Sequence, residues 1–402
     1  MRPRAIVLIA LEGHMSARVY LDWNATTPLR REAREAMAVA FDVCGNPSSI
    51  HAEGRQARRL VEDARLAIAG AVGAVPRNVI FTSGGTEANA LALAPGLRRV
   101  SGRPIERLVV SAIEHASVLA GGQFHAEEVS SVGVNHSGLI DLDWLRTALE
   151  AGPPALVSVM FANNETGALQ PVVAAAEMVH DAGGLLHVDA IQGFGKIPID
   201  INKIGADLMT FSGHKIGGPK GIGAVVLSEG LLGLEPQLRG GGQERGRRAG
   251  TENLMGIAGF GAAARATMSA LDRYAPDLED LRKRLEMGLR QTPGVIIFSD
   301  DIARLPNTTL FTVPGLKAET AVIAFDLAGI AVSSGSACSS GKVQPSHVLE
   351  AMGFGSQIAQ GAVRLSLGWS TTSADIDCCL EAWRKLASTL LKRSDETRLE
   401  RF

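Results

Sequence analysis

The chain of 402 residues has little of what would commit it to several large classes of protein. Its four cysteines are too few for a disulfide framework at this length, so we expect a reducing compartment and a cytoplasmic location. Lysine and arginine (40) nearly balance aspartate and glutamate (42), which gives no general attraction to nucleic acid or to anionic membranes. The composition therefore favours a small-molecule substrate and argues against direct nucleic-acid binding.

Long apolar runs are also missing. No segment approaches the ~20 consecutive apolar residues of a membrane-spanning helix, so we expect no membrane association. Residues 5–11 form an apolar stretch behind two arginines that resembles a signal peptide, but the stretch has only the minimum length for one. Met1 and Met15 are both compatible with a translation start.

Short apolar runs alternate with helical patterns between about residues 78 and 228. Such runs suit strands that are buried on both faces, and a helical pattern over residues 172–181 ends at Gly183-Gly184, a common helix stop. We therefore predict an α/β fold built on a mostly parallel sheet. The predicted strands are residues 79–81, 108–110, 156–160, 185–188, 208–211 and 224–227.

Helical patterns flank this region, and the pattern changes after it. Helices are predicted over residues 28–41 and 55–72 before the sheet and over residues 251–271 after it. A second helix is predicted over residues 278–290, followed by strands and helices of an α+β arrangement. We predict a large α/β domain over residues 29–272 and a small α+β domain formed by residues 1–28 and 273–402.

Polar residues follow several predicted strands, at the sheet edge where open α/β folds bind their ligands. After the first strand, Gly84-Gly85-Thr86 opens a helix whose free N–H groups suit a phosphate, although a glycine turn alone is not specific. Asp189 ends one later strand and Lys215 follows the next. This order matches the needs of a pyridoxal phosphate enzyme, in which the lysine forms a Schiff base and the aspartate keeps the pyridine nitrogen protonated.

Other strand ends add candidates for the same site. Ser212 and His214 precede the lysine and offer donors to a phosphate, while Gln192 lies three residues after the aspartate. His115 follows a further strand, where an imidazole could stack on a cofactor ring or move protons, and Asn164 offers an amide. Each residue alone has a simpler structural explanation, such as a helix cap, so the prediction depends on their occurring together.

Cys338 lies in the segment Ser333-Ser334-Gly335-Ser336-Ala337-Cys338-Ser339-Ser340-Gly341. These small residues bury too little apolar surface to fix a loop against a core, so we expect a mobile thiol that solvent can reach. No lysine or arginine lies immediately beside it to lower its pKa, so any activation must come from a group farther along the chain. From this segment alone, a reactive cysteine and an incidental surface cysteine are equally acceptable.

Together the motifs resemble the cysteine desulfurases of the NifS/IscS type, class-V aminotransferase relatives with the aspartate-aminotransferase fold of pyridoxal phosphate enzymes. The resemblance runs from residue 20 to residue 372, nearly the whole chain. The runs that carry it, besides the Cys338 segment, are Tyr20-Leu21-Asp22-Trp23-Asn24-Ala25-Thr26-Thr27-Pro28, His187-Val188-Asp189-Ala190-Ile191-Gln192, Ser212-Gly213-His214-Lys215-Ile216-Gly217-Gly218-Pro219-Lys220-Gly221 and Gly240-Gly241-Gly242-Gln243-Glu244-Arg245-Gly246-Arg247-Arg248-Ala249-Gly250-Thr251.

The resemblance implies pyridoxal 5′-phosphate as the cofactor, conversion of L-cysteine to L-alanine, and transfer of the sulfur to Cys338 as a persulfide. It implies a homodimer, no metal, and delivery of the sulfur to an iron–sulfur scaffold protein of the NifU/IscU kind or to another acceptor. The implied roles are Lys215 as the Schiff-base lysine, Asp189 on the pyridine nitrogen, Gln192 near the ring hydroxyl, His115 stacked on the ring, Gly85, Thr86, Ser212 and His214 on the phosphate, Thr251 reaching the partner's site, and Asn164 and Arg364 on the substrate carboxylate.

Other functions are compatible with parts of this pattern. A selenocysteine lyase or another class-V aminotransferase would share the cofactor residues, although an aminotransferase has no need of Cys338. A metal or iron–sulfur carrier is disfavoured, because the four cysteines lack metal-ligand spacing. A catalytically silent sulfur-relay protein is disfavoured by the presence of Lys215, Asp189 and Cys338.

Overall fold

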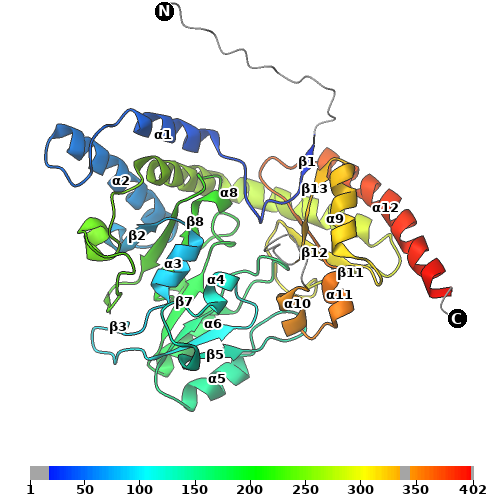
Figure 1. The fold of residues 1–402 in the computed structure, drawn as a ribbon, viewed down its shortest axis with the longest axis horizontal. Helices are drawn as coiled ribbons and strands as arrows, with labels where there is room; N and C mark the ends of the chain where they lie inside the picture. The colour runs from blue at the N-terminus through cyan, green and yellow to red at the C-terminus, as the bar shows by residue number, and fades with distance from the viewer. Residues whose placement is uncertain (1–17, 336–344, 400–402) are drawn as a thin grey trace, which may run out of the picture.

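The computed structural model describes residues 18–335 and 345–399, and its larger part is built on a seven-stranded sheet (Figure 1). The strand order is β2-β9-β8-β7-β6-β4-β5, and only β9 runs antiparallel to its neighbours. The α/β fold with a mostly parallel sheet is therefore confirmed. The strands are β2 (Val79–Thr82), β4 (Arg107–Ser111), β5 (Val129–Val132), β6 (Ala155–Ser158), β7 (Leu185–Asp189), β8 (Leu208–Ser212) and β9 (Gly223–Leu227).

Helices cover both faces of this sheet, which explains the continuous apolar runs of its strands. Alternate residues of one strand enter different cores: Val109 packs with α2, α5, α6 and α8, while Leu108 and Val110 pack with α3 and α4 on the other face. These helices are α2 (Ala52–Ala71), α3 (Gly85–Ala92), α4 (Ala116–Leu119), α5 (Leu142–Glu150), α6 (Val172–Asp181) and α8 (Leu254–Leu289).

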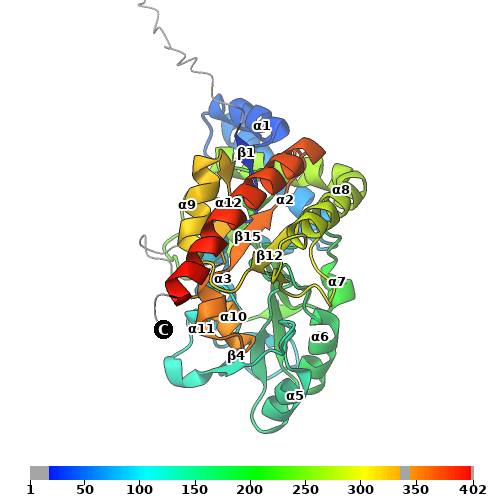
Figure 2. The same cartoon turned by 90° about the vertical axis from the view of Figure 1, so that its right-hand side faces the viewer.

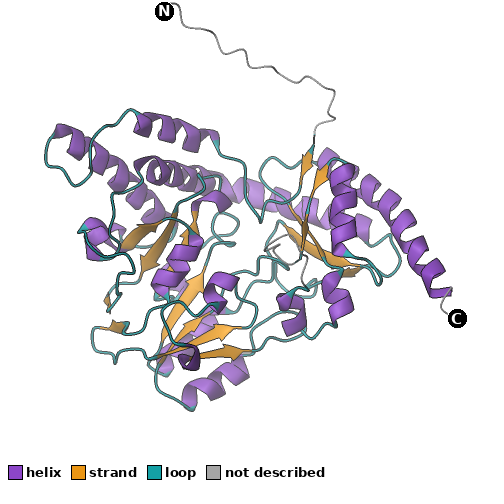
Figure 3. Cartoon of the chain, viewed as in Figure 1, coloured by secondary structure: helices purple, strands orange, loops and turns teal. Residues whose placement is uncertain are grey.

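A second, antiparallel sheet forms the smaller part of the molecule, to the right in Figures 1 and 3. Its order is β11-β12-β15-β14, and a short parallel pair joins β1 near the N-terminus to β13. Trp383 of α12 is fully buried beside this sheet, against Phe311 and Phe325. The elements are β1 (Val19–Tyr20), β11 (Ile296–Ile297), β12 (Thr308–Thr312), β13 (Ile330–Ala331), β14 (Ser333–Ser334), β15 (Val363–Ser366), α9 (Ala318–Leu327), α10 (His347–Ala351), α11 (Ser356–Gln360) and α12 (Ser373–Leu399).

Helix α8 connects the two parts as a single helix of 36 residues (Figure 2). The prediction of two helices, over residues 251–271 and 278–290, is wrong because Pro276 is accommodated inside one continuous helix. Phe260 packs in the core of the large sheet, while Leu271 and Leu285 pack in the core of the small one, so tertiary contacts offset the hydrogen bond that the proline cannot donate. The predicted boundary between residues 272 and 273 falls inside this helix, and the domain division stays a prediction.

By length and composition α8 could also cross a membrane, but 61% of its most apolar stretch is buried inside the protein, as expected for a core helix. The remaining described elements are short or lie at the periphery. They are α1 (Arg31–Phe41), α7 (Ile201–Ile204), β3 (Arg98–Arg99) and β10 (Leu231–Leu232).

Candidate active site

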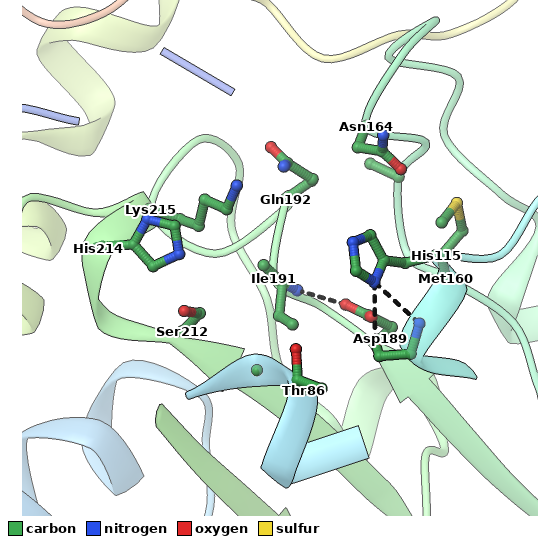
Figure 4. Close-up of a pocket in the computed structure, with 13 residues that line it drawn as sticks. Thr86, His115, Met160, Asn164, Asp189, Ile191, Gln192, Ser212, His214 and Lys215 are labelled. Carbon is green, nitrogen blue, oxygen red and sulfur yellow. Dashed lines mark hydrogen bonds between the residues drawn. The ribbon is translucent and has the colours of Figure 1, made fainter. Parts of the chain in front are cut away.

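A cavity of about 270 Å³ opens at the carboxyl ends of β4, β6, β7 and β8, beside the first turn of α3 (Figure 4). The structure brings most of the predicted site residues together in its wall. Met160, Ala162, Ile191 and Ser117 complete the lining without having been predicted. The predicted residues that line the cavity are Gly85, Thr86, His115, Asn164, Asp189, Gln192, Ser212, His214 and Lys215.

The first turn of α3 forms one end of the cavity. Its N-cap is Gly84, which offers no side chain to the first N–H groups, so these donors are available to an anion. A Cβ atom on Gly85 would lie 2.4 Å from Cδ1 of Ile191, so any larger residue at this position would displace the end of the isoleucine side chain that lines the cavity. Burial, followed by Lys215 and Lys220, lowers the pKa of His214 to about 4, so this imidazole is neutral near pH 7.

Asp189 ends β7 and is held by two donors. Its Oδ2 accepts from Nδ2 of Asn89 at 2.8 Å, and its Oδ1 accepts from the backbone N–H of Ile191 at 3.0 Å. Burial raises the pKa of Asp189, while the bonds from Asn89 and Ile191 and the nearby His115 oppose that rise. The two donors therefore favour the carboxylate that a cofactor nitrogen would need.

Asn89 belongs to a buried polar chain that the sequence analysis did not find. Its Oδ1 accepts from the hydroxyl of Thr210 at 2.6 Å, and Nε2 of His187 lies 3.2 Å from the same hydroxyl oxygen. Since Thr210 donates to the asparagine, it must accept from the histidine, and Nδ1 of His187 accepts from Ser158 at 2.8 Å. Burial lowers the pKa of His187 to about 3, so this histidine is neutral near pH 7. The chain from Ser158 to Asn89 therefore carries no charge of its own where it meets the carboxyl group of Asp189.

His115 lies over Asp189 in Figure 4 and caps α4. Its Nδ1 accepts from the backbone N–H of Ser117 at 3.1 Å and lies 2.8 Å from the hydroxyl of the same residue. Burial, Lys215 and His347 lower the pKa of His115, and Asp189 opposes them. The imidazole is therefore neutral near pH 7, with its hydrogen on Nε2 and its ring open to the cavity.

Lys215 follows β8, and its amine points towards Gln192 across the cavity (Figure 4). Nζ donates to the backbone carbonyl oxygens of Asn24 at 2.5 Å and of Ala25 at 2.8 Å. Burial, followed by the positive charge of Arg364, lowers the pKa of Lys215 to about 8. A sizeable fraction of the amine is thus uncharged and nucleophilic near that pH.

Asn24 connects the lysine to the small sheet. Its backbone N–H donates to the hydroxyl of Ser366 on β15 at 2.9 Å, and its Nδ2 donates to the hydroxyl of Thr308 on β12 at 2.9 Å. The side-chain amide of Gln192 donates to the carbonyl oxygen of Asn24 at 3.0 Å. Asn24 lies in one of the motifs noted above, but no role was predicted for it, because its partners are distant along the chain.

Arg364 lies beside the cavity and does not line it. Its Nη1 donates to the carbonyl oxygen of Asn164 at 3.0 Å, and its Nη2 lies 2.9 Å from Oδ1 of Asp22. Its buried Nε has no hydrogen-bond partner within the described residues. The structure thus places Arg364 next to Asn164, as the prediction of a shared carboxylate site requires.

Of the remaining predicted residues, one lies elsewhere in the structure and one falls outside the residues that it describes. Thr251 is exposed and lines a separate hollow with Ser83 and Glu252, so it does not reach the cavity of its own chain. Cys338 lies outside the described residues. Of the other cysteines, Cys379 is fully buried while Cys44 and Cys378 are exposed.

Comparison with known proteins agrees with this geometry. The family model for class-V aminotransferases matches residues 19–378. A cysteine desulfurase from Cereibacter sphaeroides is 44% identical over 90% of this chain and 94% of its own length. The cysteine desulfurase IscS of Dictyoglomus turgidum is 37% identical over 94% of this chain and 96% of its own. The crystal structure of a NifS-like protein from Rickettsia africae superposes with a TM-score of 0.83 at 37% identity, covering 92% of this chain and all of that one.

The chain therefore belongs to the class-V aminotransferase family of pyridoxal phosphate enzymes. Within that family its relatives are the cysteine desulfurases of the NifS/IscS type, as the sequence motifs predicted. The residues of the cavity fit the family's cofactor. A helix N-terminus without a side-chain cap faces the place for a phosphate, a buried carboxylate faces the place for a ring nitrogen, and an amine of lowered pKa lies within the cavity.

Proposed function

We propose that this protein removes sulfur from L-cysteine, with pyridoxal 5′-phosphate bound in the cavity, and leaves L-alanine and a persulfide on Cys338. The observation that carries the proposal is the joint placement of Lys215 and Asp189 in one cavity at the first turn of α3. When bound, the cofactor supplies an electron sink for the pair of electrons that remains at Cα after a proton leaves.

Each residue has a defined task in this proposal. The amine of Lys215 removes the Cα proton, which a neutral amine with a pKa of about 8 can do near neutral pH. Asp189, kept anionic by its two donors, stabilises a protonated ring nitrogen. Gln192 would donate to the ring oxygen, Gly85, Thr86, Ser212 and His214 would bind the phosphate, and His115 would lie against the ring.

The substrate carboxylate is assigned to Asn164 and Arg364, whose planar guanidinium has an unpaired Nε donor. The thiolate of Cys338 then attacks the substrate sulfur, and the bond between that sulfur and Cβ breaks. The sulfur stays on Cys338 as a persulfide, and the three-carbon remainder takes up protons and leaves as L-alanine. His115 or the substrate itself accepts the thiol proton.

We also propose a homodimer in the cytoplasm that passes its persulfide sulfur to an acceptor. Thr251 supports the dimer, because it is exposed and away from its own cavity, where it could reach the cavity of a second copy. The acceptor is proposed to be an iron–sulfur scaffold protein or another thiol protein, in line with the IscS name of one relative.

The proposal is tested by incubating the purified protein with L-cysteine and a thiol reductant and measuring alanine and sulfide. We expect equal amounts of both products, falling to background in Cys338→Ala while the visible absorbance of the bound cofactor is kept. Cys378→Ala is the matched control, because Cys378 is an exposed cysteine near the start of α12 and does not line the cavity, and it should match the wild type.

Three results would contradict the proposal: no product from a cofactor-loaded protein, unequal products, or an active Cys338→Ala variant. Repeating the assay with selenocysteine separates the proposed activity from that of a selenocysteine lyase, which would release alanine from selenocysteine alone.

A further inference from the structure

Lys196 is a buried lysine beside the site that the mechanism above does not use. Only 6% of its surface is exposed, and its Nζ lies 2.6 Å from Oδ1 of Asn24 and 2.7 Å from Oε1 of Gln192. No carboxylate pairs with it within the described residues, and burial, together with the positive charges of Lys215 and Arg364, lowers the pKa of Lys196 well below its ordinary value. A buried lysine with only neutral acceptors is rare and costs stability, so its presence needs a reason.

The backbone directs this side chain inward. Lys196 follows β7 in a tight turn in which its N–H donates to the carbonyl oxygen of Gly193 at 3.0 Å. Gly195 has φ +76, and a Cβ there would lie 2.6 Å from a methyl carbon of Thr267. The hydroxyl of Tyr274 donates to the carbonyl oxygen of Gly195. Helix α8 therefore packs closely on this turn, and the lysine is held beneath the cavity rather than reaching solvent.

Lys196 and the carbonyl oxygen of Asn24 hold the two ends of the Gln192 amide. Nζ of Lys196 lies 2.7 Å from Oε1, and the NH₂ group donates to the carbonyl oxygen of Asn24 at 3.0 Å. A carbonyl oxygen can only accept, so it sets which end of the amide carries the NH₂ group, while the bond from Lys196 holds the Oε1 end. Without the lysine, Oε1 would lose its hydrogen-bond partner among the described residues, and the amide would be held at one end only.

The amine of Lys196 also donates a hydrogen bond to the side chain of Asn24. Its bond to Oδ1 fixes the side chain of the residue whose carbonyl oxygen accepts from both Lys215 and Gln192. Asn307, which directly precedes strand β12 of the small sheet, donates to the same Oδ1 at 3.1 Å. Oδ1 of Asn24 therefore accepts one hydrogen bond from Lys196, which follows the large sheet, and one from Asn307, beside the small sheet. Lys196 thus contacts the two groups that set where a ring-oxygen donor and the catalytic amine lie.

We propose that Lys196 is a positioning residue, which presents the NH₂ group of Gln192 to the ring oxygen of pyridoxal phosphate and fixes the carbonyl against which Lys215 rests. The inference rests on the proposed function to the extent that the cofactor is pyridoxal phosphate in this cavity. Lys196 itself contacts neither the reacting atoms nor the cavity, since it is absent from the lining.

The first test is a double-mutant cycle on cofactor affinity, measured by titrating cofactor-free protein with pyridoxal phosphate. Lys196→Met keeps the length of the side chain and removes its donors, and we expect the Kd to rise about tenfold, as for loss of one buried hydrogen bond. In a Gln192→Leu background the same change should have a smaller effect, about threefold or less, because only the contact with Asn24 is left to lose. Lys203→Met, an exposed lysine seven positions along, is the matched control and should leave the Kd unchanged.

A second test uses the cofactor-free protein and stays decisive if Lys196→Met does not fold. Gln192→Glu places a carboxylate at hydrogen-bond distance from the amine of Lys196, whereas Gln192→Leu leaves that amine without this partner. The cofactor-free Gln192→Glu protein should therefore melt at a higher temperature than Gln192→Leu, while cofactor affinity falls in both. A melting temperature of Gln192→Glu at or below that of Gln192→Leu would overturn the claim that the Lys196 amine is hydrogen-bonded to residue 192. Equal effects of Lys196→Met in both backgrounds, or none in either, would overturn the positioning role. A protein that binds no pyridoxal phosphate would contradict the proposed function alone, because the melting measurement needs no cofactor.

Discussion

Glu165 supports a prediction about stability that can be worked out from its surroundings. It follows Asn164, is only 2% exposed, and its Oε2 accepts from the hydroxyl of Ser346 at 2.5 Å. The same hydroxyl caps α10 by accepting from the N–H of Leu349 at 3.1 Å. Burial raises the pKa of Glu165 from 4.5 to about 7, against the opposing effects of Ser346 and Arg364.

The raised pKa makes the free energy of unfolding depend on pH. Between pH 4.5 and 7 the unfolded chain releases this proton while the folded chain keeps it, so the folded state binds more protons. The contribution of Glu165 to stability is therefore complete below pH 4.5 and is lost as the pH rises through 7. At about 1.4 kcal/mol for each pH unit, the loss over this window amounts to roughly 3 kcal/mol.

Glu165→Gln tests this magnitude, because glutamine has no proton to lose and keeps an oxygen for Ser346. Unfolding by urea would be followed for both proteins at several pH values from 4.5 to 8. Relative to the wild type, the variant should gain roughly 3 kcal/mol of stability on going from the acid to the alkaline end. A difference that stays constant with pH would refute a protonated Glu165 in the folded protein, and a difference that falls with pH would reverse the sign of the argument.

Two further predictions concern the polar chain behind the cavity and the core of the small sheet. Asn89→Leu removes a hydrogen-bond donor from Asp189, so the pKa of Asp189 should rise. The acid limb of the pH profile for alanine formation should then move to higher pH by about 1–2 units. An acid limb at the wild-type position would contradict the role of Asn89. Trp383→Ala should lower the free energy of unfolding by about 3–5 kcal/mol, since a fully buried indole is lost from the core around Phe311; a loss below about 1 kcal/mol in urea unfolding would contradict that placement.

The sequence predicted the parts of the site that follow buried strands. Asp189, Lys215 and His115 each come directly after an apolar run, so a regular rule about sheet edges located them without knowledge of tertiary contacts. Asn24 and Lys196 escaped this rule. Their significance lies in contacts with residues of both sheets, and neither spacing nor composition shows that a lysine will be buried against neutral oxygens.

Helix α8 shows a different error, because the local patterns predicted two helices, over residues 251–271 and 278–290. The structure has one continuous helix with Pro276 inside it, although a proline normally ends or kinks a helix. In the structure the residues on either side of Pro276 pack into the core of the small sheet, with Leu271 before it and Leu278 after it. Burial of these side chains outweighs one missing hydrogen bond, and such a balance cannot be judged from the sequence.

The dependence of Asn24 on Ser366 has a consequence for biosynthesis. The two residues are 342 positions apart, and the bond from the asparagine N–H to the serine hydroxyl joins the beginning of the chain to its last described strand. The carbonyl oxygen on which Lys215 rests can be set in place only when nearly the whole chain has left the ribosome. We therefore expect cofactor loading to follow completion of the chain, because a nascent or prematurely terminated chain would carry Lys215 without the strand that holds Asn24.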